Sequence, residues 1–256
     1  RDEGITGMKA LITGGAGYVG SVLIPQLLAR GQRVRNLDLY IYGEESLASV
    51  RGNPLLEEMK GDIRDKRLLA DALKGCDAVL HLACISNDPS VELNPDLSRT
   101  VNYEAFQSLV ERSKEMGVKR FIFASSGSVY GVSDDPDVTE EHPLVPVSLY
   151  NKYKAMCEDF LKPYMTPDFP TVVVRPATIC GYSPRQRLDL TVNILTTHAV
   201  NRGKILVFGG AQMRPNLHMQ DMVNLYIQLL DEPEENISGQ IFNAAYQNYS
   251  VSQTAD

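Results

Sequence analysis

The segment that most constrains the fold is a glycine-rich turn near the amino terminus. Residues 8–13, Met-Lys-Ala-Leu-Ile-Thr, form a short apolar run, and Gly14, Gly17 and Gly20 follow it directly. Apolar residues at helical spacing then continue to Ala29. This order predicts a buried strand, a tight turn and a helix.

Strand-like and helix-like segments go on alternating along the chain. The later predicted strands span 33–39, 55–60, 78–83, 119–125 and 171–175, and the predicted helices span 18–29, 65–74, 96–116 and 150–162. Continuous apolar strands separated by helices are typical of a parallel sheet covered on both faces, with right-handed crossovers. The expected fold is therefore α/β, a Rossmann-like doubly wound parallel sheet with ligands at the carboxyl ends of its strands.

The regular alternation ends late in the chain. A stretch rich in Gly, Pro and Arg at 179–187 precedes a predicted helix at 188–202 and a short predicted strand at 205–208. We expect residues 8–177 to form a nucleotide-binding Rossmann domain that also carries the catalytic residues. Residues 178–256 are expected to form a smaller substrate-binding subdomain, partly interleaved with that domain.

The two ends of the chain are interpreted separately. Residues 1–7 precede Met8 and lack apolar periodicity, so we regard them as a cloning remnant or a short native extension. Ser250 and Ser252 suit the start of a further helix close to Asp256. The final elements of the subdomain are therefore expected to be missing.

Composition and charge argue against several classes of protein. Hydrophobic residues make up 43% and charged residues 22%, and no apolar run approaches the length of about 18 residues that a membrane span needs. A net charge of −7 without a basic run argues against a nucleic-acid partner. The four cysteines show neither C-x-x-C nor zinc spacing, which predicts reduced thiols and no metal. No secretory signal is visible, so the expected location is the cytoplasm.

The glycine turn and Asp38 together predict a dinucleotide site. Glycines that end a strand and open a helix let a diphosphate approach the helix amino terminus. Asp38 ends the next strand at the interval of roughly 20 residues at which a carboxylate binds the adenosine ribose. A carboxylate would repel a 2′-phosphate, and residues 39–42 are not basic, so NAD is favoured over NADP. Alone, the turn would suit any strand-to-helix connection, and Asp38 would suit a solvated strand end.

A second candidate for the adenosine end of the cofactor follows the third strand. Asp62 and Ile63 could place a carboxylate and an apolar side chain against the adenine. A helix cap explains Asp62 equally well.

Tyr150 and Lys154 lie four residues apart and so on one face of a predicted helix. A tyrosine normally titrates at about 10, and a nearby cation lowers that pKa toward the range in which the phenol acts as a general base. Tyr153 lacks such a partner, because position 157 is Cys. The pair follows a buried strand that opens into a serine-rich loop at 125–128, and such serines can reach a substrate hydroxyl. Alone, the pair would suit a surface helix and the serines a turn.

Taken together, these residues resemble the extended short-chain dehydrogenase/reductase superfamily, and within it the NAD-dependent nucleotide-sugar epimerases and dehydratases. The resemblance runs over nearly the whole chain from Met8. Its markers are the glycine turn at 13–20, Gly61-Asp62-Ile63, His81-Leu82-Ala83, Val101-Asn102, the loop at 125–131, Tyr150 with Lys154, Arg175-Pro176, and residues 214–218 followed by Asp221.

The resemblance implies roles for individual residues. Ser126, Tyr150 and Lys154 would form the catalytic group, and Ser126 and Tyr150 would contact the sugar. Asn193 and Arg214 would bind the nucleotide diphosphate, although a polar helix position explains Asn193 slightly better. The implied partners are a nucleotide-diphosphate sugar and a second copy of the chain, paired through the helices predicted at 96–116 and 150–162. The implied NAD-binding residues are Gly14, Gly17, Tyr18, Val19, Gly20, Asp38, Asp62, Ile63, Leu82, Ala83, Asn102, Tyr150 and Lys154.

The resemblance also implies a reaction. In the epimerase branch, Tyr150 would take the proton of the sugar 4′-hydroxyl while C4′ passes hydride to NAD, and the 4-keto sugar would turn and be reduced on its other face. The dehydratase branch typically carries an Asp-Glu pair where this chain has Gly127-Ser128. We therefore expect 4-epimerisation of the UDP-glucose 4-epimerase kind.

Other activities stay open at this point. A dehydratase, decarboxylase or dehydrogenase of the same family is the first alternative, and a catalytically silent NAD-binding regulatory protein is the second. Thr178 and Cys180 depart from the usual epimerase pattern beside the sugar site, so the sugar is undetermined. Cys84 could act as a second acid or base, but a buried thiol at a strand end explains it better.

Overall fold

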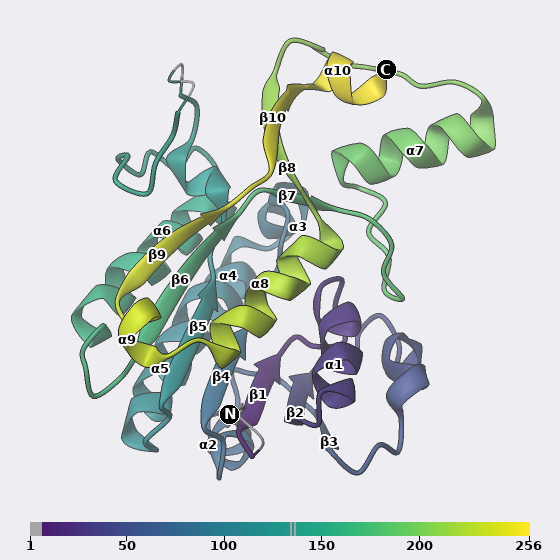
Figure 1. The fold of residues 1–256 in the computed structure, drawn as a ribbon. Helices are drawn as coiled ribbons and strands as arrows, with labels where there is room; N and C mark the ends of the chain where they lie inside the picture. Colours follow the sequence, from purple (N-terminus) through teal and green to yellow (C-terminus); the bar gives the residue numbers. More distant parts are fainter. Residues whose placement is uncertain (1–6, 134, 136) are drawn as a thin grey trace.

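The computed structural model describes residues 7–133, 135 and 137–256, so only Gly7 of the predicted extension is described. At its centre is a seven-stranded sheet of order β3-β2-β1-β4-β5-β6-β9, in which every pairing is parallel (Figure 1). The order reverses direction between β1 and β4, as in a doubly wound sheet. The predicted Rossmann-like α/β fold is confirmed.

A second, three-stranded sheet of order β10-β8-β7 lies beyond the upper end of the large sheet in Figure 1. Within it β10 runs antiparallel and β7 parallel to β8. The strands are β1 (Lys9–Thr13), β2 (Arg33–Asp38), β3 (Leu56–Lys60), β4 (Ala78–His81), β5 (Arg120–Ala124), β6 (Thr171–Pro176), β7 (Thr178–Cys180), β8 (Met213–His218), β9 (Gln240–Ala244) and β10 (Gln247–Ser250).

Helices connect these strands and cover both faces of the large sheet. The α-helices are α1 (Gly20–Ala29), α2 (Lys66–Leu73), α3 (Asp88–Leu93), α4 (Pro95–Arg99), α5 (Ala105–Glu115), α6 (Leu149–Leu161), α7 (Thr191–Arg202), α8 (Met219–Asp231), α9 (Glu234–Ile237) and α10 (Val251–Ala255). A π-helical turn at Thr100–Glu104 joins α4 to α5, and 3₁₀ turns span Glu45–Val50, Gly127–Tyr130 and Lys162–Tyr164. In the described residues, no helix combines the length and the apolar character that crossing a membrane requires.

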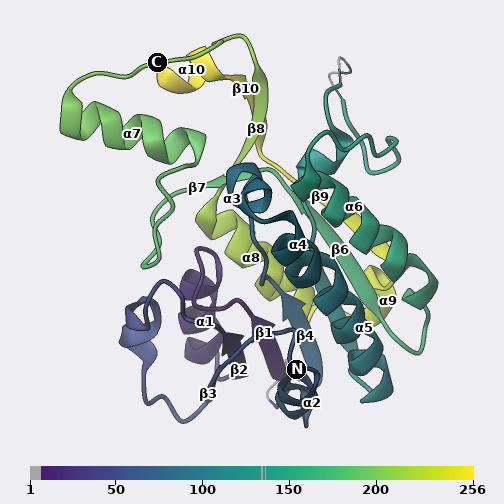
Figure 2. The same ribbon diagram turned by 180° about the vertical axis from the view of Figure 1, so that it is seen from behind.

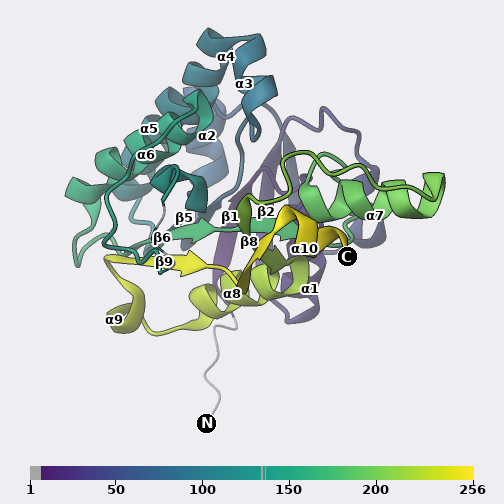
Figure 3. The same cartoon turned by 90° about the horizontal axis from the view of Figure 1, so that it is seen from above.

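Alternate residues of β1 supply two separate cores. Ala10 and Ile12 pack in the core that α1 and α8 cover, whereas Leu11 packs with Phe106 of α5 in the core on the other face. Figure 3 shows α1 and α8 on one side of the sheet and α2, α5 and α6 on the other. Figure 2 shows the second of these layers from its outer side. Because both faces are covered, β1, β4 and β6 are almost continuously buried.

One predicted strand is wrong. Residues 205–208 form no strand, and the strand of this region is β8, which begins at Met213. Leu206, Val207 and Phe208 are all exposed, so the apolar run packs against no sheet. An isolated strand would leave its backbone donors and acceptors without ladder partners.

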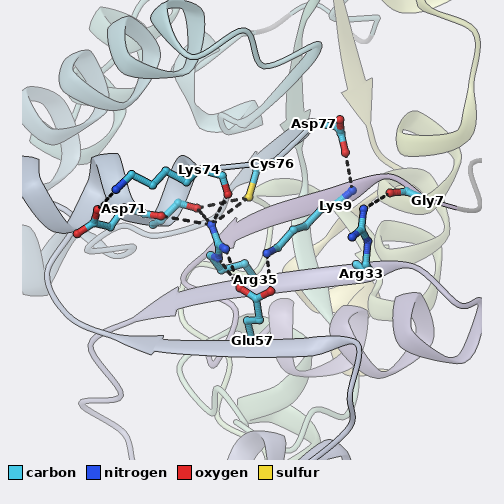
Figure 4. A network of polar contacts seen from close by, with 10 residues as sticks. Gly7, Lys9, Arg33, Arg35, Glu57, Asp71, Lys74, Cys76 and Asp77 are labelled. Carbon is cyan, nitrogen blue, oxygen red and sulfur yellow. Dashed lines mark hydrogen bonds and ion pairs between the residues drawn. The ribbon is translucent and has the colours of Figure 1, made fainter.

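A cluster of charged side chains lies near the amino-terminal ends of β1, β2 and β3 (Figure 4). Glu57 of β3 accepts from Lys9 Nζ at 2.5 Å and from Arg35 Nε at 2.8 Å. Arg35 also donates to the Ala72 and Lys74 carbonyls at 2.7 Å each, at the carboxyl end of α2. These contacts therefore join β1, β2, β3 and α2 at the end of the sheet opposite the carboxyl ends of its strands.

His81, at the end of β4, should make the fold sensitive to acid. The centroid of its ring lies 5.5 Å from that of the Phe106 ring, and its Nδ1 lies 2.7 Å from the Thr13 hydroxyl oxygen. Burial, with the Lys154 charge, lowers the pKa of His81 from 6.5 to about 3. The unfolded chain therefore binds a proton that the folded chain does not, and the free energy of unfolding should fall by about 1.4 kcal/mol per pH unit below pH 6.5.

Urea unfolding at pH 7 and pH 5 measures this contribution. A His81→Gln variant keeps a group that can bond Thr13 but cannot titrate, and it should lose part of the pH dependence. If the free energy of unfolding changes equally between pH 7 and pH 5 in the variant and the wild type, His81 is not the acid-sensitive group.

Candidate active site

The glycine turn lies where the strand order reverses, between β1 and β4. Gly14 has φ +76°, and a Cβ there would come within 2.7 Å of the Ala83 backbone. A Cβ on Gly20 would lie 2.4 Å from the Gly15 Cα, and one on Gly17 would lie 3.0 Å from the Gly14 oxygen. Close backbone packing thus disfavours a side chain at these three glycine positions of the turn.

The Asp38 side chain reaches back to the glycine turn from the carboxyl end of β2. Its Oδ2 accepts a hydrogen bond from the Ala16 amide at 2.9 Å, and its Oδ1 accepts from the Tyr40 amide at 2.7 Å. Asn36, two residues earlier, accepts from the Gly15 amide at 2.9 Å. The half-buried carboxylate therefore lies directly beside the turn.

Asp62 follows β3 and forms an ion pair that the sequence did not predict. Arg64 Nη2 lies 2.5 Å from Asp62 Oδ2, and the Arg64 amide donates to Oδ1 at 2.9 Å. These bonds hold the pKa of Asp62 below its usual range. The helix cap that was the alternative for Asp62 is provided by Asp65, whose side chain accepts from the amides of Arg67 and Leu68. Ile63 is buried in the core.

The segment after β4 closes over the glycine turn. The Leu82 amide donates to the Thr13 carbonyl at 3.0 Å, which places Ala83 against Gly14. Asn102, in the π-helical turn, bonds both the amide and the carbonyl of Ile85, at 2.8 and 3.0 Å. Its buried side chain thus fixes the path of this segment.

Tyr150 and Lys154 project from the same face of α6, as predicted from their spacing. Lys154 Nζ donates to the Ala124 carbonyl at 2.6 Å and lies 4.9 Å from the centroid of the Phe123 ring. It lies 5.9 Å from the centroid of the Tyr150 ring. The ammonium is buried at the end of β5 and is already bonded to the backbone there.

The expectation that Lys154 lowers the pKa of Tyr150 is not met by the protein alone. Burial is the largest influence and raises the pKa of Tyr150 above 10, and Cys84 and Asp88 raise it further. Arg187 lowers this pKa most, followed by a hydrogen bond with Ser126. The penalty for burying a phenolate therefore outweighs the nearby cations.

The Ser126 hydroxyl is bonded within its own loop. Its Oγ lies 2.7 Å from Ser128 Oγ and accepts from the Ser128 amide at 3.2 Å. Ser128 in turn donates to Asn151 Oδ1 at 2.5 Å. The loop after β5 is thereby joined to the helix that carries Tyr150.

A buried ion pair behind this loop was missed by the sequence reasoning. Glu158, one turn beyond Lys154 on α6, lies 2.6 Å from Arg175 of β6, and both side chains are almost fully buried. Glu158 also accepts from the Ser125 hydroxyl, and Arg175 donates to the Tyr130 hydroxyl at 2.6 Å. The spacing of positions 150, 154 and 158 was a signal that this glutamate shares the face of Tyr150 and Lys154.

The two residues expected to bind the nucleotide diphosphate differ in their surroundings. Asn193 is buried, and its amide bonds the Gly181 amide, the Arg187 carbonyl and the Tyr18 hydroxyl at 2.8 to 3.0 Å. Arg214 is exposed on β8, opposite Tyr249 of β10. The structure thus joins Asn193 to Tyr18 of the glycine turn and leaves Arg214 accessible.

Two further arginines, Arg185 and Arg187, reach this region from the loop after β7. Arg187 is paired with Asp189 at 2.6 Å and donates to the Ser86 hydroxyl at 3.2 Å. The Arg185 guanidinium lies 3.6 Å from the centroid of the Tyr42 ring, in the segment after Asp38. Only the richness of residues 179–187 in arginine, glycine and proline hinted at either contact.

Comparison with known proteins decides the family. A model described as the NAD dependent epimerase/dehydratase family matches residues 10–245. The chain belongs to this family. The UDP-glucose 4-epimerase of Mycolicibacterium smegmatis is 32% identical to it, over 86% of this chain and 72% of that protein. The chain covers 70%, 52% and 81% of the length of three other curated relatives.

Solved structures of two activities superpose on the chain. A dTDP-glucose 4,6-dehydratase from Streptomyces venezuelae with NAD bound matches with a TM-score of 0.86 at 28% identity, over 97% of this chain and 79% of that one. A UDP-glucuronic acid 4-epimerase from Bacillus cereus, in complex with UDP-glucuronic acid and NAD, matches with a TM-score of 0.84 at 27% identity, over 95% of this chain and 80% of that one.

The residues at the glycine turn fit NAD, the cofactor of this family. The turn has glycine at the positions where a side chain would collide with neighbouring backbone atoms, and it leads directly into the amino terminus of α1, where a diphosphate can bind. Asp38 lies beside it with a carboxylate able to accept from ribose hydroxyls.

An Asp38→Asn variant should bind NAD about ten- to a hundredfold more weakly, because hydrogen bonds to a charged carboxylate are lost. Discrimination against NADP should fall at the same time, because the repulsion of a 2′-phosphate is removed. Calorimetric titration of protein stripped of cofactor gives both dissociation constants. An unchanged ratio of the two constants would place Asp38 away from the ribose.

Proposed function

We propose that the chain is an NAD-dependent nucleotide-sugar 4-epimerase, similar in reaction to UDP-glucose 4-epimerase. The observation that carries this proposal is the loop after β5, in which Ser126 lies beside Tyr150 while Gly127 and Ser128 replace the Asp-Glu pair of the dehydratase branch. A Cβ on Gly127 would lie 3.2 Å from the Pro176 carbonyl oxygen. An aspartate there would have to push against the end of β6.

The cofactor-binding residues are proposed from their place in the fold. The adenosine would be bound by Asp38, Asp62 and Ile63, and the nicotinamide ribose by Tyr150 and Lys154. When bound, NAD supplies a reversible hydride acceptor for C4′. The remaining proposed contacts come from the turn and from the segment after β4, through Gly14, Gly17, Tyr18, Val19, Gly20, Leu82, Ala83 and Asn102.

Tyr150 would perform the acid–base chemistry, and Ser126 would hydrogen-bond the 4′-hydroxyl of the sugar. Tyr150 would take the proton of the 4′-hydroxyl as that carbon is oxidised and return it when the other face of the sugar is reduced. The raised pKa of Tyr150 in the protein alone makes the phenol the resting form. The positive charge of oxidised NAD, added to Lys154 and Arg187, would favour the phenolate when the cofactor is bound.

Residues 178–256 are proposed as the substrate-binding part of the molecule. Exposed Arg214 would bind the diphosphate through its guanidinium. Asn193 would act less directly, because its amide already bonds Tyr18, Gly181 and Arg187. We further propose that two copies pair through α5 and α6, where Met116 and Met156 are exposed.

A dTDP-hexose 4,6-dehydratase is the second candidate, favoured by the superposition of the Streptomyces venezuelae enzyme over 97% of the chain. Elimination of water from the sugar needs its own acid and base, and the loop after β5 has Gly127 and Ser128 at the relevant positions. This difference is why we rank the dehydratase second. A decarboxylase or dehydrogenase, and a regulatory protein without turnover, rank below it.

Product analysis separates these candidates. Protein loaded with NAD would be incubated with UDP-glucose, UDP-glucuronic acid and dTDP-glucose, and the sugar protons followed by NMR. We expect one of these sugars to reach an equilibrium of its two C4′ epimers with no net consumption of NAD. A 4-keto-6-deoxy sugar would identify a dehydratase, and steady formation of NADH a dehydrogenase.

A further inference from the structure

The loop between β7 and α7 is hydrogen-bonded to the glycine turn and to the start of α1. The Tyr18 hydroxyl donates to the Gly181 carbonyl at 2.8 Å, and Ser183 Oγ donates to the Tyr18 carbonyl at 2.6 Å. Ser183 Oγ also lies 2.8 Å from Ser21 Oγ, and these two serines are each 1% exposed. Figure 1 shows this loop reaching down toward α1. We call residues 181–187 the strap.

The strap is bonded within itself and reaches a second element. Gln186 accepts from the Ser183 amide at 2.8 Å and donates to the Gly181 carbonyl at 3.3 Å. Between them, Arg185 places its guanidinium 3.6 Å from the centroid of the Tyr42 ring, in the segment after β2. The strap therefore extends from the amino terminus of α1 to the segment that follows Asp38.

The two ends of the strap differ in how strongly they are held. Breaking the buried bonds of Ser183 would leave polar groups without partners, which is costly. Tyr42 is 68% exposed, and a cation–π contact at an exposed site changes an equilibrium only about two- to fivefold. We therefore expect the strap to open at Arg185 while its Ser183 end stays in place.

The strap joins the two elements proposed to bind the adenosine half of NAD, namely the amino terminus of α1 for the diphosphate and Asp38 for the ribose. We infer that the strap is a gate over this half of NAD, and that it opens where Arg185 leaves Tyr42. The inference rests on the proposed placement of NAD and on no step of the proposed reaction. A contact that is the same in the free and the bound protein favours neither state, so the gate controls the rates of NAD exchange and not the affinity.

Weakening the gate should speed entry and exit of the cofactor by the same factor. Arg185→Ala and Tyr42→Ala should each raise the association and the dissociation rate constants about two- to fivefold and leave their ratio, the dissociation constant, unchanged. The double variant should be no faster than either single variant, because both substitutions remove the same contact.

Stopped-flow fluorescence with NADH as the probe measures both rates. Mixing protein stripped of cofactor with NADH gives the association rate constant, and mixing NADH-loaded protein with excess NAD gives the dissociation rate constant. An unchanged dissociation constant also shows that the cofactor site of a variant is folded. The measurement needs no sugar nucleotide, so its result is independent of the proposed 4-epimerisation.

Two control variants isolate the contact. Tyr42→Phe keeps the aromatic ring under Arg185 and should keep the wild-type rates. Arg51→Ala removes an arginine outside the strap, which donates to the Glu44 carbonyl at 3.0 Å. Loss of positive charge alone should slow the association of an anionic cofactor, which is opposite to the faster association expected for Arg185→Ala.

Faster dissociation of NADH without faster association would show that Arg185 or Tyr42 contacts the cofactor directly, and would overturn the gate. Unchanged rates in both alanine variants would also overturn it, as would effects that add in the double variant. Equal acceleration of both rates by each substitution, with no further gain in the double variant, is the result that supports it.

Discussion

Replacing Tyr150 by phenylalanine is expected to lower kcat by roughly 10²–10⁴-fold, the usual contribution of a positioned acid–base group. The substitution removes only the hydroxyl, so the ring should stay beside the Lys154 ammonium, 5.9 Å from its centroid. Binding of NAD should change little, because the glycine turn and Asp38 are untouched. Initial rates on the active sugar nucleotide and the NAD content of the purified variant measure the two effects.

Tyr153→Phe provides the matched control on the same helix. Tyr153 is buried, and its hydroxyl donates to the Pro95 carbonyl at 3.4 Å, away from Ser126. This variant should turn over at nearly the wild-type rate. Comparable rates in the two phenylalanine variants would remove Tyr150 from the mechanism.

Breaking the buried ion pair between Glu158 and Arg175 should have the largest effect on stability. Arg175→Met leaves Glu158 as a buried carboxylate without its cation, at a cost of about 3–5 kcal/mol in the free energy of unfolding. Both side chains are at most 3% exposed, so solvent screens the pair little. Urea unfolding monitored by circular dichroism measures the change.

Two further variants separate a lost ion pair from a lost side chain. Glu158→Leu combined with Arg175→Met should be less destabilising than the sum of the two single changes, because no charge is left unpaired. Glu57→Gln weakens the ion pairs with Lys9 and Arg35, but the Glu57 carboxylate is 52% exposed, so the change should cost at most about 1 kcal/mol. Similar losses for Glu57→Gln and Arg175→Met would contradict this account of burial.

Much of the large sheet was predictable because its signals are local. The apolar run before Gly14, the helical spacing that follows and Asp38 at the end of β2 all lie within one strand–helix–strand unit. The spacing of Tyr150 and Lys154 likewise predicted that they share a face of α6. Residues 205–208 show the limit, because a strand also needs a neighbouring edge that the sequence does not display.

The electrostatics of the site could not be predicted because they depend on contacts between distant segments. Arg187 and Cys84 come near Tyr150 only through the tertiary fold. Burial raises the pKa of Tyr150, whereas the sequence predicted that it would be lowered. Glu158 meets Arg175 across two elements. For Asn193 a polar helix position was slightly preferred over a diphosphate ligand, and neither interpretation predicted that its side-chain amide bonds Tyr18, Gly181 and Arg187.

A sugar nucleotide carrying deuterium at C4′ tests the central claim most directly. The proposed reaction removes hydrogen from C4′ and returns it to the same carbon from the other face. NMR of the product should therefore show deuterium retained at C4′ in the inverted sugar, with NAD recovered in its oxidised form. Deuterium found at C6′ of a dehydrated sugar, or retained in reduced cofactor, would contradict the assignment as a 4-epimerase.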